Sequence, residues 1–115
     1  INATIKDDYV EVLLAEFEQQ KKEMITYRKY IVLHNEQLKY PICVYRISEQ
    51  EYSALQMRCS HQGNELTAFG DKLHCPAHGS EFDKTGNVTM GPADKPLRTF
   101  MVTKTNTQLL ISLKA

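Results

Sequence analysis

The chain has 115 residues, of which 42% are hydrophobic, and its 14 basic and 14 acidic residues give a formal net charge of zero. This length fits one domain, and the apolar content is enough for a core, which excludes a disordered chain. The neutral charge and the lack of a basic stripe argue against a nucleic-acid-binding protein. No apolar run approaches the roughly 20 residues of a membrane span, so we expect no membrane-spanning segment in this chain.

The N-terminal half predicts short strands separated by polar turns. In residues 7–18, apolar and polar side chains alternate in part, which predicts a strand with a helical end. Residues 19–24 are polar and predict an exposed loop. Residues 29–34, 40–47 and 52–58 are rich in β-branched and aromatic side chains, which favours a meander of strands.

The C-terminal half continues this pattern. A tight hairpin is expected before residues 72–73 and another turn at residues 84–88. Two prolines exclude a regular strand at residues 91–96, and final strands are predicted at residues 97–103 and 108–113. Short strands at regular spacing predict an all-β fold, an antiparallel sandwich or barrel.

Two stretches, "CSHQG" and "HCPAHGSEFD", each combine a cysteine with a histidine. The spacing is Cys59-x-His61, then thirteen residues, then Cys75-x-x-His78. A structural zinc site usually opens with a Cys-x₂₋₄-Cys pair and keeps its histidines together. One Cys and one His in each loop instead favours two metal atoms, one bound by both thiolates and the other by both imidazoles. A structural zinc module that binds another protein stays the alternative of a different class.

The sequence resembles the Rieske [2Fe–2S] iron–sulfur proteins. The matching segments are the two stretches above, the turn "TGNV" and the loop "GPADKPL", all within residues 54–100. The resemblance implies one [2Fe–2S] cluster per chain, with Cys59 and Cys75 on the inner iron and His61 and His78 on the outer iron.

The family fold is an antiparallel β sandwich or barrel base with a small inserted rubredoxin-like cluster-binding subdomain. Carried over to this single domain of residues 1–115, the base comprises residues 1–57 and 93–115. The insertion then comprises residues 58–92. Cluster binding is expected to contribute to the folding of the insertion, because its loops have little core of their own.

The resemblance also implies roles for residues around the ligands. Gly63 and Gly79 let the backbone pass close to the metal, and Pro92 belongs to a loop that shields the cluster from water. Ser80 occupies the position of a serine whose hydroxyl donates to a bridging sulfide in the high-potential members, which raises the potential. Phe82 stands where those members have a second donor, a tyrosine, so we expect an intermediate potential.

Two further positions separate this chain from the quinol-oxidising members. Those proteins carry two extra cysteines that form a disulfide between the cluster loops, and the corresponding residues here are Asn64 and Ala77. The disulfide is therefore not expected, which places the chain nearer the ferredoxin and oxygenase-type members.

The remaining candidate ligands are interpreted as structural. Cys43 lies in the apolar run "PICVYRI" and is expected in the core. His34 is expected on the surface. His74 adjoins Cys75, but strand alternation directs it away from the cysteine, so we expect it not to bind metal.

The predicted function is one-electron transfer, to or from a redox protein partner that belongs to an oxidoreductase system. An oxygenase would need a catalytic iron with two more histidines and a carboxylate, and only His34 and His74 remain, so we predict an electron carrier and not an enzyme. An alternative is the soluble head of a membrane-tethered quinol-oxidising or other respiratory complex. The serine of the second box and the start at Ile1 favour an exported domain with an anchor upstream, over a cytoplasmic ferredoxin.

Overall fold

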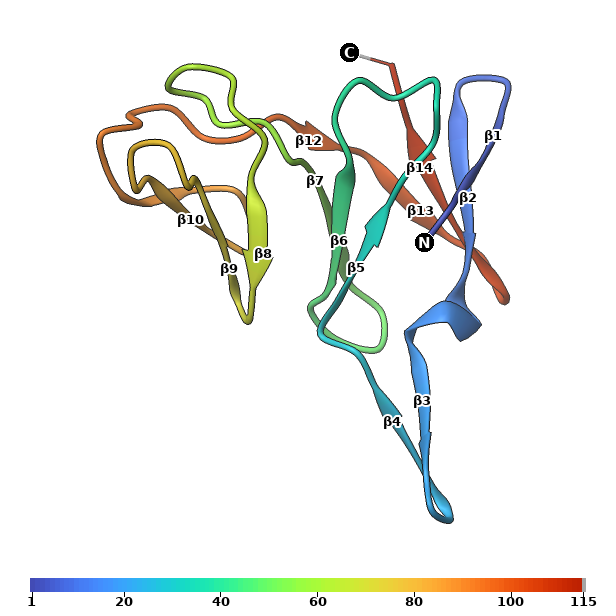
Figure 1. Ribbon diagram of the computed structural model, residues 1–115. Helices are drawn as coiled ribbons and strands as arrows, with labels where there is room; N and C mark the ends of the chain where they lie inside the picture. Colours follow the sequence, from blue (N-terminus) through green and yellow to red (C-terminus); the bar gives the residue numbers. More distant parts are fainter. Residues whose placement is uncertain (115) are drawn as a thin grey trace.

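The computed structural model describes residues 1–114, which form short β-strands and one 3-10 helical turn (Figure 1). The first strands are β1 (Thr4–Lys6), β2 (Tyr9–Leu13), the turn η1 (Leu14–Phe17), β3 (Glu18–Lys21), β4 (Met24–Tyr27), β5 (Tyr30–Leu33), β6 (Ile42–Arg46) and β7 (Tyr52–Gln56). They are followed by β8 (Thr67–Phe69), β9 (Lys72–His74), β10 (Glu81–Asp83), β11 (Val88–Met90), β12 (Thr99–Phe100), β13 (Val102–Lys104) and β14 (Gln108–Ser112). The predicted all-β class is confirmed. Within the described residues, no helix is both long and apolar enough for a bilayer crossing.

Two four-stranded antiparallel sheets form a sandwich. Their strand orders are β1-β2-β14-β13 and β12-β7-β6-β5. Alternation places one face of each strand inside: on β2, Val10 and Val12 are buried, and on β14 so are Leu109 and Ile111. These side chains pack with residues of the second sheet in one hydrophobic core.

The β12-β7-β6-β5 sheet is covered on both faces, with a third sheet of order β11-β10-β9-β8 beyond its other side (Figure 1). On β6, Ile42 and Val44 belong to the sandwich core, whereas Cys43 and Tyr45 belong to a second core. This is why residues 42–45 are a continuous apolar run and not an alternating one. The second core also contains Leu73 and Phe82 of the third sheet, along with Cys59 and Cys75.

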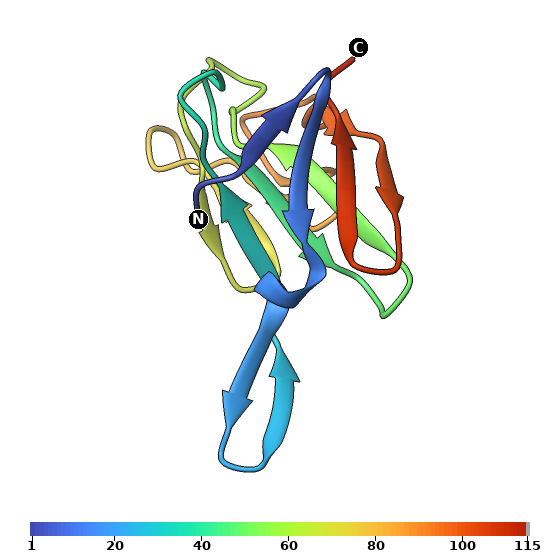
Figure 2. The ribbon, with the colours of Figure 1, turned by 90° about the vertical axis from the view of Figure 1, so that its right-hand side faces the viewer.

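Two strand predictions were wrong. Residues 19–24 are not a loop, because β3 and β4 pair as a hairpin, with Gln20 opposite Ile25, that projects from the body of the protein (Figure 2). Its side chains are mostly exposed on both faces, so no hydrophobic alternation marks it in the sequence. The single strand predicted at 97–103 divides at Met101: β12 pairs with β7, and β13 pairs with β14 in the other sheet.

The other element predictions are confirmed. Residues 7–18 form β2 followed by the turn η1, and strands occupy most of 29–34, 40–47, 52–58 and 108–113. The tight hairpin before residues 72–73 is the β8–β9 turn, where Gly70 has a φ of 58°. The exact division into a base and an insertion at residues 58–92 stays a prediction.

A substitution of Leu55 tests how much the second core contributes to stability. It is fully buried on β7, so Leu55→Ala should lower the free energy of unfolding by about 2–5 kcal/mol through lost burial and an unfilled cavity. Leu13→Ala, at a half-exposed position, should cost ~0.5 kcal/mol or less. Urea denaturation followed by circular dichroism measures both, and equal losses for the two variants would contradict this packing.

Candidate metal centre

The four predicted ligands lie in two loops that follow strands β7 and β9. Cys59 and Cys75 are buried in the second core, with 1% and 0% of their surface exposed. His61 and His78 are exposed, and their ring centroids lie 5.2 Å apart with the ring planes nearly perpendicular, at 88°. The fold therefore separates the four residues into a buried thiol pair and an exposed imidazole pair.

The two loops have the same backbone hydrogen bonds, although they hold their histidines at different positions. In each loop, the cysteine carbonyl accepts from the glycine four residues later, and the cysteine N–H donates to the carbonyl five residues later. The bonds are Gly63 N–H to Cys59 O at 2.8 Å, Gly79 N–H to Cys75 O at 2.9 Å, Cys59 N–H to Asn64 O at 2.7 Å and Cys75 N–H to Ser80 O at 2.8 Å. Both turns need a left-handed residue, and Gly63 and Gly79 supply it with φ of 80° and 85°.

The proline-containing loop at residues 91–97 is bonded to both cysteine loops. Ser80 is fully buried, and its Oγ accepts the N–H of Ala93 at 3.0 Å. On the other side, the Ser60 hydroxyl donates to the Lys95 carbonyl at 2.6 Å. Ala93 and Leu97 of this loop are buried in the second core, whereas Pro92 is exposed.

Phe82 and Cys43 belong to the second core beside the thiol pair. Phe82 is fully buried and, as a phenylalanine, brings no hydroxyl to the site. Cys43 is also fully buried, and burial raises the pKa of its thiol to about 12, so it stays protonated at neutral pH. Because a metal ligand must be a thiolate, this protonated thiol is not suited to bind metal. The core position predicted for Cys43 is confirmed.

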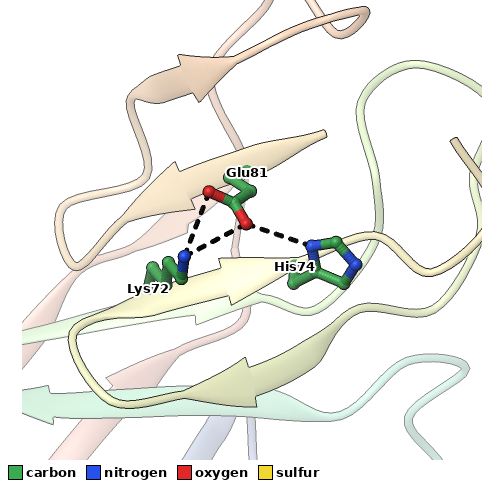
Figure 3. A network of polar contacts seen from close by, with 3 residues as sticks. All are labelled: Lys72, His74 and Glu81. Atoms are coloured by element: carbon green, nitrogen blue, oxygen red, sulfur yellow. Dashed lines mark hydrogen bonds and ion pairs between the residues drawn. The ribbon is translucent and has the colours of Figure 1, made fainter. Parts of the chain in front are cut away.

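His74 points away from the cysteine loops, as strand alternation predicted. Its Nδ1 lies 3.2 Å from Oε2 of Glu81, which also forms an ion pair with Lys72 Nζ at 3.2 Å (Figure 3). The hydrogen bond from Lys72 is the largest cause of a lowered pKa of the Glu81 carboxyl; desolvation by burial opposes it, and the hydrogen bond with His74 adds to the lowering. His34 is exposed, and its backbone pairs with Asn2 in an isolated bridge.

The donor set fits a two-iron centre better than a single ion. Within residues 1–114, no three Cys, His, Asp or Glu side chains gather as the ligands of one ion. What the loops do offer is two soft thiols on the buried side and two imidazoles on the exposed side. Thiolates and imidazoles are the ligand types found on the two irons of a mixed-ligand [2Fe–2S] cluster.

Sequence reasoning missed the contacts that hold the loops in place. Tyr40, which precedes β6, donates from its hydroxyl to the Gly63 carbonyl at 2.9 Å, across 23 residues of chain. The bond between Ser60 and Lys95 spans 35 residues. Neither contact has a local signal in the sequence, because each joins segments that only the fold brings together.

Comparison with known proteins agrees with this geometry. The family model described as the Rieske [2Fe-2S] domain matches residues 15–101. Among curated proteins, the iron–sulfur subunit of the chloroplastic cytochrome b6-f complex of Bigelowiella natans is 38% identical over 56 residues, which cover 47% of this chain and 22% of that protein. The chain thus spans less than a quarter of that relative's length.

Solved structures show the same fold. The plasma membrane Rieske protein PetC3 of Synechocystis PCC 6803 is 26% identical with a TM-score of 0.63, and the match covers 73% of this chain and 86% of that one. The ferredoxin of Sphingomonas yanoikuyae B1 is 25% identical with a TM-score of 0.55, covering 73% and 84%.

The Glu81 contacts predict a pH-dependent effect. The pKa of Glu81 is lowered in the folded protein, so its contribution to stability is present above the ordinary glutamate pKa and is lost as pH falls through the lowered value. Glu81→Gln should therefore unfold at lower urea concentration than the unsubstituted protein at pH 7, with the difference disappearing toward pH 3. Glu36→Gln, at an exposed position outside this network, is the control, and a difference for Glu81→Gln that persists at acid pH would contradict the interpretation.

Proposed function

This chain belongs to the Rieske [2Fe–2S] family and carries single electrons on one such cluster, and on that premise we propose that Cys59 and Cys75 bind one iron while His61 and His78 bind the other. The observation that carries this assignment is the division of the site into buried thiols and exposed imidazoles 5.2 Å apart. Bound there, the cluster supplies a one-electron couple with neutral imidazoles on one iron, which makes it easier to reduce than an all-thiolate centre.

Different residues of this chain protect the cluster from water and expose it to a partner. The second core keeps Cys59 and Cys75 away from water. His61 and His78 present exposed ring edges, which form the route by which an electron enters or leaves. Electron transfer needs close approach of a partner, and the exposed pair offers it without any movement of the core.

We assign the partner to the class of redox proteins that belong to oxidoreductase systems. The similarity to a ferredoxin supports a freely diffusing carrier. The similarity to cytochrome b6-f iron–sulfur subunits and to a plasma membrane Rieske protein supports the second candidate, the head of a membrane-tethered complex. Ser80, shared with the high-potential members, favours an exported domain of that second kind.

The ligand assignment predicts metal content. The protein should be red-brown and contain two irons and two acid-labile sulfides per chain. Cys59→Ser and Cys75→Ser should abolish both, whereas Cys43→Ser should keep them, because the protonated core thiol is not a ligand. Iron and sulfide analysis with EPR of the reduced protein measures this. A colourless protein with one zinc per chain would instead establish the zinc module.

We propose that Ser80 raises the reduction potential of the cluster. Its Oγ already accepts the Ala93 N–H, and within residues 1–114 its own hydroxyl hydrogen has no protein acceptor. That hydrogen is therefore available to a sulfide, and a donor to sulfur favours the reduced cluster. Because Phe82 supplies no second hydroxyl, we expect a midpoint above those of Rieske ferredoxins and below those of the quinol-oxidising proteins.

Protein-film voltammetry tests the role of Ser80. Ser80→Ala should weaken electron binding about tenfold, which lowers the midpoint by ~60 mV for a one-electron couple. Ser48→Ala, in the turn between β6 and β7, should leave the midpoint unchanged. A midpoint for the unsubstituted protein near the bottom of the family range of roughly −150 to +300 mV would contradict the tuning.

A further inference from the structure

The first cysteine loop is held from the base by a residue outside the metal centre. Tyr40 is half-buried in the connection between β5 and β6, and its hydroxyl donates to the carbonyl of Gly63 at 2.9 Å. The next residue, Pro41, accepts the N–H of Met57 at 2.9 Å, so this connection is fixed to the chain just before Cys59. Tyr40 thus joins the loop of His61 to a connection that is itself hydrogen-bonded to Met57.

The Arg58 side chain lies beside the same glycine. A side-chain carbon built on Gly63 would lie 3.1 Å from the Arg58 Nη2 atom and 3.5 Å from Cζ. The guanidinium also lies near the Tyr40 ring, with 5.9 Å from Cζ to the ring centroid. Gly63 is therefore held through its carbonyl by Tyr40 and packed against by Arg58.

The second loop has no such arrangement. A side-chain carbon built on Gly79 would meet nothing within 4 Å, even though the turn has nearly the same φ. That loop is held instead through Ser80 and Ala93. Tyr40 and Arg58 are therefore specific to the loop of His61 and are not a general requirement of the turn.

The charge of Arg58 is not neutralised nearby. Its backbone pairs with Glu65 in an isolated bridge, yet in the described part of the chain no carboxylate lies within ion-pair distance of its guanidinium. The exposed guanidinium lies beside Gly63, which is two residues along the chain from the proposed ligand His61. Reduction adds a negative charge to the centre, and a nearby cation stabilises the reduced form.

We propose that Tyr40 and Arg58 are positioning residues of the first cluster loop, holding Gly63 and with it His61, and that the Arg58 charge raises the reduction potential. The inference rests on the proposed function. In this role the pair substitutes for the loop disulfide, for which Asn64 and Ala77 provide no cysteines. The loop is braced to the base and not to the opposite loop.

Three variants separate the two parts of the proposal. Tyr40→Phe removes only the hydroxyl, and it should lose cluster to an iron chelator several-fold faster than the unsubstituted protein. Arg58→Gln should weaken electron binding about three- to tenfold, a fall of ~30–60 mV in the midpoint, and the fall should shrink as salt is added. Arg58→Lys keeps the charge, so it should retain most of the midpoint.

Matched controls come from the opposite end of the base, near the projecting hairpin (Figure 1). Tyr27→Phe removes a hydroxyl on β4, and Arg28→Gln makes the same change in net charge as Arg58→Gln. Both should match the unsubstituted protein in bleaching rate and midpoint. Visible absorbance measures the bleaching rate, voltammetry the midpoint, and EPR g values report any change in the ligand geometry.

The outcomes are distinct from those of the proposed function. If the unsubstituted protein binds no iron and sulfide, the proposed function fails. If it binds the cluster but Tyr40→Phe bleaches no faster than Tyr27→Phe, the brace is overturned. If Arg58→Gln keeps the midpoint of Arg28→Gln, or Arg58→Lys falls as far as Arg58→Gln, the role of the charge is overturned.

Discussion

The double burial of the central sheet is the constraint on which the rest of the structure depends. On β6, neighbouring residues face different cores: Val44 packs into the sandwich, and Tyr45 packs beneath the cysteine loops. Burial of apolar surface contributes roughly 25 cal/mol per Å², so both faces of this sheet stabilise the fold. Because β7 lies in the same sheet and ends three residues before Cys59, the candidate metal centre is anchored to a sheet that is buried on both faces.

The two cysteine loops share the same backbone turn but are held in place by different contacts. Each cysteine begins a turn closed by the same pair of hydrogen bonds and ended by a left-handed glycine. The turns differ in what holds them: Ser80 and Ala93 hold the second, while Ser60, Lys95 and Tyr40 hold the first. Hydrogen bonds to the surrounding fold thus constrain loops that in the quinol-oxidising members of the family are joined by a disulfide.

Because the loops are held in this way, one side of the site is buried and the other is exposed. Thiols that start from strand ends point into the second core, and the imidazoles, two or three residues further along, emerge at the surface. An electron carrier needs this asymmetry, because its centre must be protected from water on one side and approached by a partner on the other. The spacing of one Cys and one His per loop is sufficient to produce it once both loops are aligned.

The sequence alone determined the features that depend on neighbours along the chain. The strands with continuous or alternating apolar residues, the glycines of the turns and the Cys-x-His and Cys-x-x-His spacings are all local patterns, and they predicted the fold class and the candidate ligands. The tertiary structure decided the hairpin of β3 and β4, the division of the last strands at Met101, and the contacts of Tyr40, Arg58 and Ser60. These features depend on backbone pairing and on contacts between side chains that are tens of residues apart in the sequence. Because such contacts are set by how the sheets pack, they leave no periodic pattern in the sequence.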